Sequence, residues 1–110
     1  MTKLTGVSVQ VDGTSAKHVF DSDELMSGLY KVIGTDIVQV VSFNDELEMW
    51  VDEEGALKPG RVVNKWLTSL NQALNGATYE VYGIGVFLGG SDDEGMCVGL
   101  SPSQVDALLS

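Results

Sequence analysis

The sequence has few of the residues that form covalent intermediates or hold transition metals. Its 110 residues include one cysteine, Cys97, and one histidine, His18. A single cysteine excludes a disulfide within the chain and is typical of a reducing compartment. Zinc sites combine several cysteine and histidine ligands, and nucleophilic catalysis needs a nucleophile in contact with a base, so the sequence indicates neither. We therefore predict that the protein is not an enzyme and binds no metal or cofactor.

Basic residues are also scarce. Six lysines and arginines stand against 16 aspartates and glutamates, which gives a formal net charge of −10 at pH 7. Phosphate backbones repel such a chain, so we predict no direct binding to nucleic acid. Two interpretations of the charge stay open. It keeps the protein soluble, or it forms an acidic surface that binds a basic partner protein.

Long hydrophobic runs are absent. The longest uncharged apolar stretch, residues 81–90, has about half the length of a membrane-spanning helix. The first residues alternate in polarity and do not form the continuous apolar core of an export signal. We expect a cytoplasmic protein that does not enter membranes. The length and the 44% hydrophobic content predict a single domain over residues 1–110.

Three segments carry helix signals. The first begins at the capping residue Asp21 and continues with apolar residues at helical spacing to Ile33. The second has an apolar stripe over 63–74, on which Trp66 is predicted to be a core residue. The third opens at 101–104 with serine, proline, serine and glutamine, the order of a capping box with proline at the first helical position.

Strand signals lie between and around these helices, at 4–11, 37–43, 47–51, 79–88 and 96–98. The resulting order, β-α-β-β-α-β-β-α, predicts an α+β fold with a mainly antiparallel sheet and helices on one face, and its first six elements match the ferredoxin-like pattern. Gly83 and Gly85 interrupt the fourth strand without the third glycine of a dinucleotide fingerprint. We expect a helix to cross the sheet close to them.

Half of the basic residues gather within eight positions at the start of the second helix. They are Lys58, Arg61 and Lys65. A helix N-terminus offers unpaired N–H groups and a partial positive charge, and Asn64 supplies a further hydrogen-bonding group. These four residues are therefore a candidate site for an anion such as a phosphorylated nucleotide. The alternative is that the bases only neutralise the acids of 45–54.

An acidic and aromatic group forms the second candidate site. Trp50 falls on the polar phase of its strand, and an exposed tryptophan is typical of an interface. With Glu48, Glu53 and Glu54 it makes a candidate surface for a partner protein. The Trp50 surface or an exposed edge strand would also support a homodimer. The acidic turns of the chain lack the alternate ligand spacing of a calcium loop, so we expect no calcium site.

Residues 51–57 (Val-Asp-Glu-Glu-Gly-Ala-Leu), Asn64 and 81–86 (Val-Tyr-Gly-Ile-Gly-Val) carry a resemblance that runs over about 9–100. The chain resembles a family of small acidic proteins of unknown function from actinobacterial phages, prophages and plasmids. Gly34-Thr35 departs from the Gly-Gly of that family. The resemblance implies a cytoplasmic accessory protein of a mobile element that acts by binding. Our leading hypothesis is that it binds and inhibits a host protein, for example a defence protein, through its acidic surface. The alternative is sequestration of a phosphorylated nucleotide at the second helix.

Overall fold

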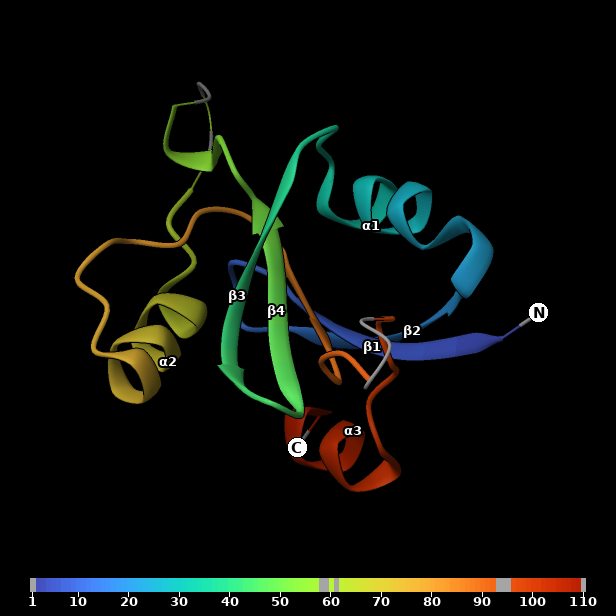
Figure 1. Cartoon of the computed structure of the whole chain (residues 1–110). Helices are drawn as coiled ribbons and strands as arrows, with labels where there is room; N and C mark the ends of the chain where they lie inside the picture. The colour runs from blue at the N-terminus through green and yellow to red at the C-terminus, as the bar shows by residue number, and fades with distance from the viewer. Residues whose placement is uncertain (1, 58–59, 61, 93–95, 110) are drawn as a thin grey trace.

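A computed structural model describes residues 2–57, 60, 62–92 and 96–109. Its centre is one antiparallel sheet with the strand order β2-β1-β5-β4-β3. The strands are β1 Lys3–Val9, β2 Ser15–Asp21, β3 Val38–Asn44, β4 Leu47–Asp52 and β5 Gly85–Leu88. The sheet is strongly twisted, and the β3–β4 hairpin crosses the direction of β1 and β2 (Figure 1). The prediction of an α+β fold with a mainly antiparallel sheet is confirmed.

The three predicted helices are present, but the predicted cap Asp21 precedes a short 3-10 turn, and the first α-helix begins only at Leu25. They are α1 Leu25–Ile33, α2 Lys65–Asn75 and α3 Pro102–Leu109, with short 3-10 turns η1 Ser22–Glu24 and η2 Gly55–Leu57. Gly34 and Gly76 end α1 and α2 in the left-handed conformation, with φ of 81° and 66°. Before α3, Ser101 Oγ accepts from Gln104 N at 3.2 Å and Gln104 Oε1 accepts from Ser101 N at 2.9 Å, which is the predicted capping box. Within the described part of the chain, no helix is long and apolar enough to cross a membrane.

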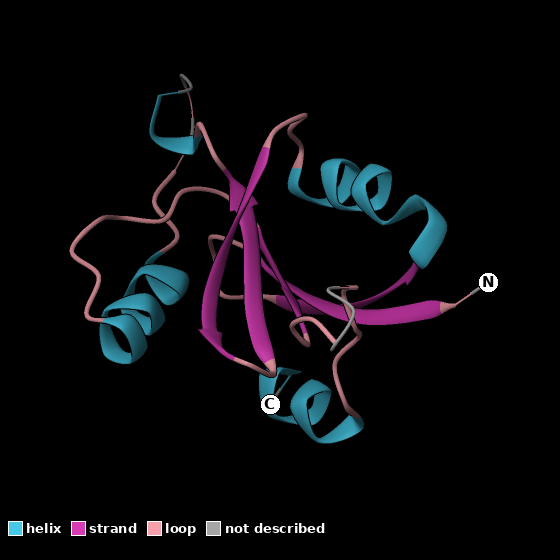
Figure 2. Cartoon of the chain, viewed as in Figure 1, coloured by secondary structure: helices cyan, strands magenta, loops and turns pink. Residues whose placement is uncertain are grey.

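Helices cover both faces of the sheet, which differs from the predicted single face. Alternate residues of each strand point to opposite sides, so Val86 and Phe87 of β5 belong to two separate apolar clusters. The cluster of Val86 includes Leu29 of α1. The cluster of Phe87 includes Leu67 of α2 and Val105 of α3. Figure 2 shows α1 apart from the other two helices, across the strands.

Strand β2 is a difference from the predicted order. It pairs antiparallel with β1 along its whole length, in the register Val9↔Ser15 to Lys3↔Asp21. The turn that joins them contains Gly13 with φ of 88°, and Gly13 N donates to Gln10 O at 2.9 Å. The observed order is therefore β-β-α-β-β-α-β-α.

Strand β5 gives the sheet a connectivity unlike the ferredoxin-like one. In a split β-α-β arrangement β1 would lie next to β4, but β5 lies between them and pairs antiparallel with both. Only 85–88 of the predicted 79–88 strand is regular. The predicted strand at 96–98 is reduced to an isolated bridge between Cys97 and Ser91.

The glycines of this segment have the role that the sequence predicts. A Cβ at Gly85 would overlap Leu67 Cδ1 of α2 and would lie 3.4 Å from Met49 Cγ. The helix therefore crosses the sheet at the residue without a side chain. Gly83 adopts φ of 78°, which side chains disfavour, and its N donates to Val62 O at 3.0 Å.

Candidate functional site

The basic cluster at α2 is only partly described. Lys58 and Arg61 lie outside the described residues. Lys65 is the first residue of α2 and is exposed. Asn64 is fully buried, so its side chain does not face an anion at the helix start. Among the described residues, the predicted anion site therefore keeps one exposed group, Lys65.

Asn64 instead joins three parts of the protein. Its Oδ1 accepts from Leu67 N at 3.1 Å and so caps α2. Its Nδ2 donates to Val9 O at 3.1 Å and to Gly83 O at 2.9 Å. Its backbone N donates to Val81 O at 2.7 Å. Asn64 is thus a positioning residue that holds the 81–83 segment against α2 and β1.

The predicted acidic and aromatic surface is divided by the sheet. Glu48 and Trp50 point to the face that α1 covers, where Glu48 is 9% exposed and Trp50 packs half-buried against the cluster of Val86. Glu48 Oε1 accepts from Trp50 Nε1 at 3.1 Å. The prediction of an exposed Trp50 is wrong, because β4 lies between two helical layers and none of its residues is fully exposed to solvent. Glu48 is therefore buried and bonded to Trp50, and Trp50 itself is only partly exposed.

Glu53 and Glu54 follow β4 and are exposed, as predicted. Their backbone is held firmly, since Glu53 N donates to Ile37 O at 3.2 Å and Glu54 N donates to Asp52 Oδ1 at 2.9 Å. Asp52 Oδ1 also accepts from Thr35 Oγ1 at 3.1 Å. A buried carboxylate therefore fixes the turn that presents the two exposed ones.

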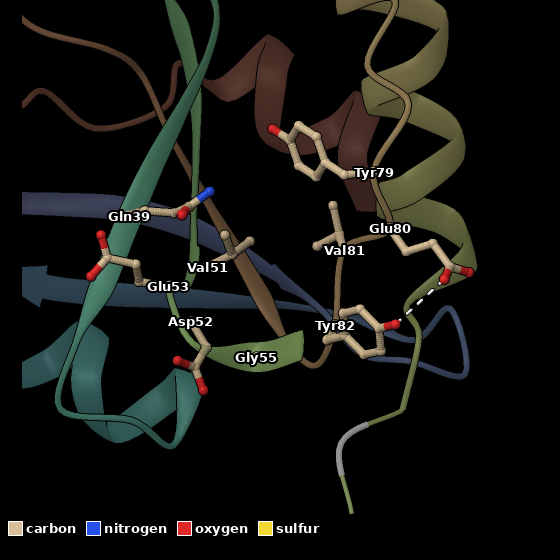
Figure 3. A pocket seen from close by; sticks show the side chains of 9 residues that line it. All are labelled: Gln39, Val51, Asp52, Glu53, Gly55, Tyr79, Glu80, Val81 and Tyr82. Atoms are coloured by element: carbon tan, nitrogen blue, oxygen red, sulfur yellow. Dashed lines mark hydrogen bonds between the residues drawn. The ribbon is translucent and has the colours of Figure 1, made fainter. Parts of the chain in front are cut away.

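A hollow of about 180 Å³ lies beside this turn, and we call it the acidic hollow. Its walls come from β3, from the end of β4 and from the extended segment that precedes β5. They are formed by Gln39, Val51, Asp52, Glu53, Gly55, Tyr79, Glu80, Val81 and Tyr82. Figure 3 shows the residues of β3, β4 and the following turn on one side and the residues of 79–82 on the other.

The far wall of the acidic hollow is attached to α2. Val81 N donates to Thr68 Oγ1 at 2.8 Å, and Val63 forms a bridge with Tyr82. The hydroxyl of Tyr82 donates to Glu80 Oε1 at 3.4 Å (Figure 3). The two sides of the hollow therefore come from segments about 30 positions apart and are each fixed by backbone hydrogen bonds.

The described lining of the acidic hollow carries charge of one sign. Of its nine described residues, three are carboxylates, two are tyrosines and none is basic. Buried Val51 and Val81 give it an apolar base. Carboxylates beside tyrosine rings attract a lysine or arginine side chain through both charge and cation–π contact. Sequence reasoning found Glu53 and missed Tyr79, Glu80 and Tyr82, since it assigned them to a strand.

His18 and Cys97 do not contact each other in the structure. His18 lies in β2, and its Nε2 is 2.9 Å from Ser8 Oγ. Ser8 is 1% exposed, so a substrate cannot reach its hydroxyl without displacement of the surrounding elements. Cys97 Sγ is 4.0 Å from Glu48 Oε1. Burial, then the carboxylates of Glu48 and Asp92, raise the pKa of the Cys97 thiol above its ordinary value, which disfavours the nucleophilic thiolate.

No cluster of three or more metal-binding side chains (His, Cys, Asp or Glu) is found within the described ranges.

A search of curated proteins and a search of solved structures each give no significant match to the chain. One family model matches residues 5–110, nearly the whole sequence. The chain therefore belongs to the family described as a domain of unknown function, DUF3846.

Proposed function

We propose that this protein is a non-enzymatic accessory protein of phages and related mobile elements that binds and inhibits a host protein through the acidic hollow and the adjoining carboxylates. The observation that carries the proposal is the hollow itself, in which three carboxylates and two tyrosines meet among the nine described lining residues. The origin from a mobile element rests on the resemblance of residues 51–57 and 81–86 to phage proteins.

The chemistry of the acidic hollow selects the kind of partner. Asp52 is buried, whereas Glu53 and Glu80 line the hollow and are exposed, and Glu54 is exposed next to Glu53 in the chain. A surface with this charge accelerates the approach of a basic partner and repels acidic ones. The tyrosines add area with few rotatable bonds, which lowers the entropy that binding costs. We therefore assign to the partner a basic surface with a lysine or arginine side chain that enters the hollow.

Capture from an actinobacterial cell extract tests this proposal. Full-length protein is immobilised, and the retained proteins are identified by mass spectrometry for the wild type and for the triple variant Glu53→Lys, Glu54→Lys and Glu80→Lys. We expect the wild type to retain a basic protein that the variant loses. The three exposed positions tolerate reversal without unfolding, which circular dichroism checks.

A matched control separates the acidic hollow from total charge. Glu24→Lys, Asp45→Lys and Asp106→Lys change three exposed carboxylates away from the hollow by the same amount. The control variant should retain the same protein as the wild type. Loss of capture in both variants, or retention in both, would contradict a specific role of the hollow, and an empty wild-type column would contradict the binding function itself.

A further inference from the structure

A second surface, on α2, has the opposite character. Trp66 is 62% exposed and Leu74 is 56% exposed, although the sequence predicts Trp66 as a core residue. With half-buried Leu70 they recur every four positions, so they form one stripe along the helix. Only Leu67 and Asn71 of α2 are buried against the sheet. The stripe is therefore apolar surface that the described fold leaves uncovered.

The stripe borders a hollow of about 330 Å³, which we call the α2 groove. Residues of α2, α3, β1, β5 and the β1–β2 turn line it, among them Val9, Trp66, Phe87 and Leu108. The indole of Trp66 lies so close to the β1–β2 turn that a Cβ at Gly13 would overlap its Nε1. Trp66 therefore packs beside the β1–β2 turn at the groove, and aromatic side chains are enriched at binding surfaces.

Charge indicates what covers this surface. The chain carries −10, but residues 55–79 contain no aspartate or glutamate, and Lys65 is the only charged residue of α2. None of the eight described residues that line the α2 groove is charged. Two copies of so acidic a chain repel each other wherever carboxylates would face carboxylates. Helix α2 has no carboxylate to add to this repulsion, and its apolar stripe is available on both copies.

We propose that the occupant of the α2 groove is a second copy of this chain. The two copies pair around a two-fold axis, so that Trp66 and Leu74 of each α2 face the same stripe on the other. Neither sheet edge offers an equal surface. Each edge strand has a single large apolar side chain that is exposed, Val19 on β2 at 58% and Val40 on β3 at 48%. This pairing is independent of the acidic hollow and leaves it accessible for a different partner.

The size of the molecule bounds the strength of the dimer. It measures 37 × 27 × 25 Å along its principal axes, so the ~800 Å² per partner of a standard interface would need most of one face. The α2 stripe covers only part of such a face, so the affinity depends on a few apolar side chains. We expect a dissociation constant on the order of 10 µM, which corresponds to a weak, reversible dimer.

Sedimentation equilibrium of the full chain tests the proposal. The wild type should convert from monomer to dimer as its concentration rises from about 1 µM to about 1 mM. Trp66→Glu should weaken the dimer by roughly a hundredfold or more, because it places a carboxylate at the centre of the apolar interface. Leu74→Glu, near the exposed end of α2, provides a second variant if Trp66→Glu fails to fold.

Two controls add the same charge at exposed valines on the sheet edges. Val19→Glu and Val40→Glu should leave the dissociation constant within about threefold of wild type. A wild type that stays monomeric at about 1 mM would overturn the proposal. A dimer that survives both α2 variants, or that is lost in an edge variant alone, would overturn it too, because the interface would then lie elsewhere.

Discussion

The conversion of Asn64 to aspartate is the sharpest test of how the hollow is held together. The two side chains have nearly the same shape, but aspartate at pH 7 has no hydrogen to donate. The cap survives, because a carboxylate oxygen still accepts from Leu67 N. The donated bonds to Val9 O and Gly83 O are both lost. The change therefore removes the hydrogen bonds that the buried Asn64 side chain donates and keeps the one that it accepts.

The loss of stability can be worked out from these contacts. Each buried carbonyl left without its partner costs about 1–3 kcal/mol, and two are affected. The two carbonyls together therefore cost about 2–6 kcal/mol. The introduced charge lies at the N-terminus of α2, where the helix dipole returns up to about 2 kcal/mol, but the position is fully buried and desolvation of the carboxylate opposes that gain. We therefore expect Asn64→Asp to lower the free energy of unfolding by about 2–6 kcal/mol, a large part of the ~5–15 kcal/mol of a typical domain.

Urea unfolding followed by circular dichroism measures this loss, and the midpoint should fall by roughly 2 M. Asn44→Asp is the matched control. Asn44 is exposed, and the hydrogen bond of its side chain is one that Oδ1 accepts from Glu46 N at 2.7 Å. The control should stay within about 0.5 kcal/mol of wild type. Equal midpoints for wild type and Asn64→Asp would refute the reasoning, because the two donated bonds would then contribute nothing to the fold.

Two further predictions concern close packing and the thiol. Gly85→Ala should lower the free energy of unfolding by about 1–3 kcal/mol, because the new methyl overlaps Leu67 Cδ1. The same substitution should cost less stability in a Leu67→Ala background, which urea unfolding measures. Equal losses in the two backgrounds would contradict the proposed overlap. Iodoacetamide should alkylate Cys97 several-fold more slowly in the folded protein than in urea, since burial and Glu48 raise the pKa of the thiol. Glu48→Gln should accelerate the alkylation of Cys97 in the folded protein, which mass spectrometry of timed samples measures. An unchanged rate would show that the Glu48 carboxylate has no influence on the thiol.

The predictions that succeeded rest on signals only a few residues long. The capping box at Ser101 and Gln104 acts through neighbouring backbone groups, so no knowledge of the rest of the chain is needed. A comparable local signal was available for β2. Asp12-Gly13 favours a hairpin turn, but the polar residues that follow it obscured the strand.

The two tryptophans show what local patterns do not contain. Trp50 was predicted to be exposed and is half-buried, whereas Trp66 was predicted to be a core residue and is exposed. Periodicity finds the faces of an element but not the neighbours that cover them. For Trp50 the neighbour is α1, and for Trp66 no described element covers the outer side of α2.

The candidate site divides in the same way. Glu53 and Glu54 belong to an acidic turn that composition and spacing reveal. Tyr79 and Glu80 reach the acidic hollow only because Asn64 and Thr68 hold their segment against α2. That approach joins residues far apart in the sequence, and a single sequence contains no direct signal for it.

The central place of β5 has a consequence for how the chain folds. The β1–β2 and β3–β4 hairpins can each form by themselves from adjacent residues, within microseconds. They become one sheet only when Gly85–Leu88 inserts between them, and the slow step is then the search for contacts distant in sequence. During synthesis the ribosome must release this late segment before either hairpin gains its inner neighbour. Until that moment each hairpin has two unpaired edges. The nascent chain is most exposed to misassociation at this stage.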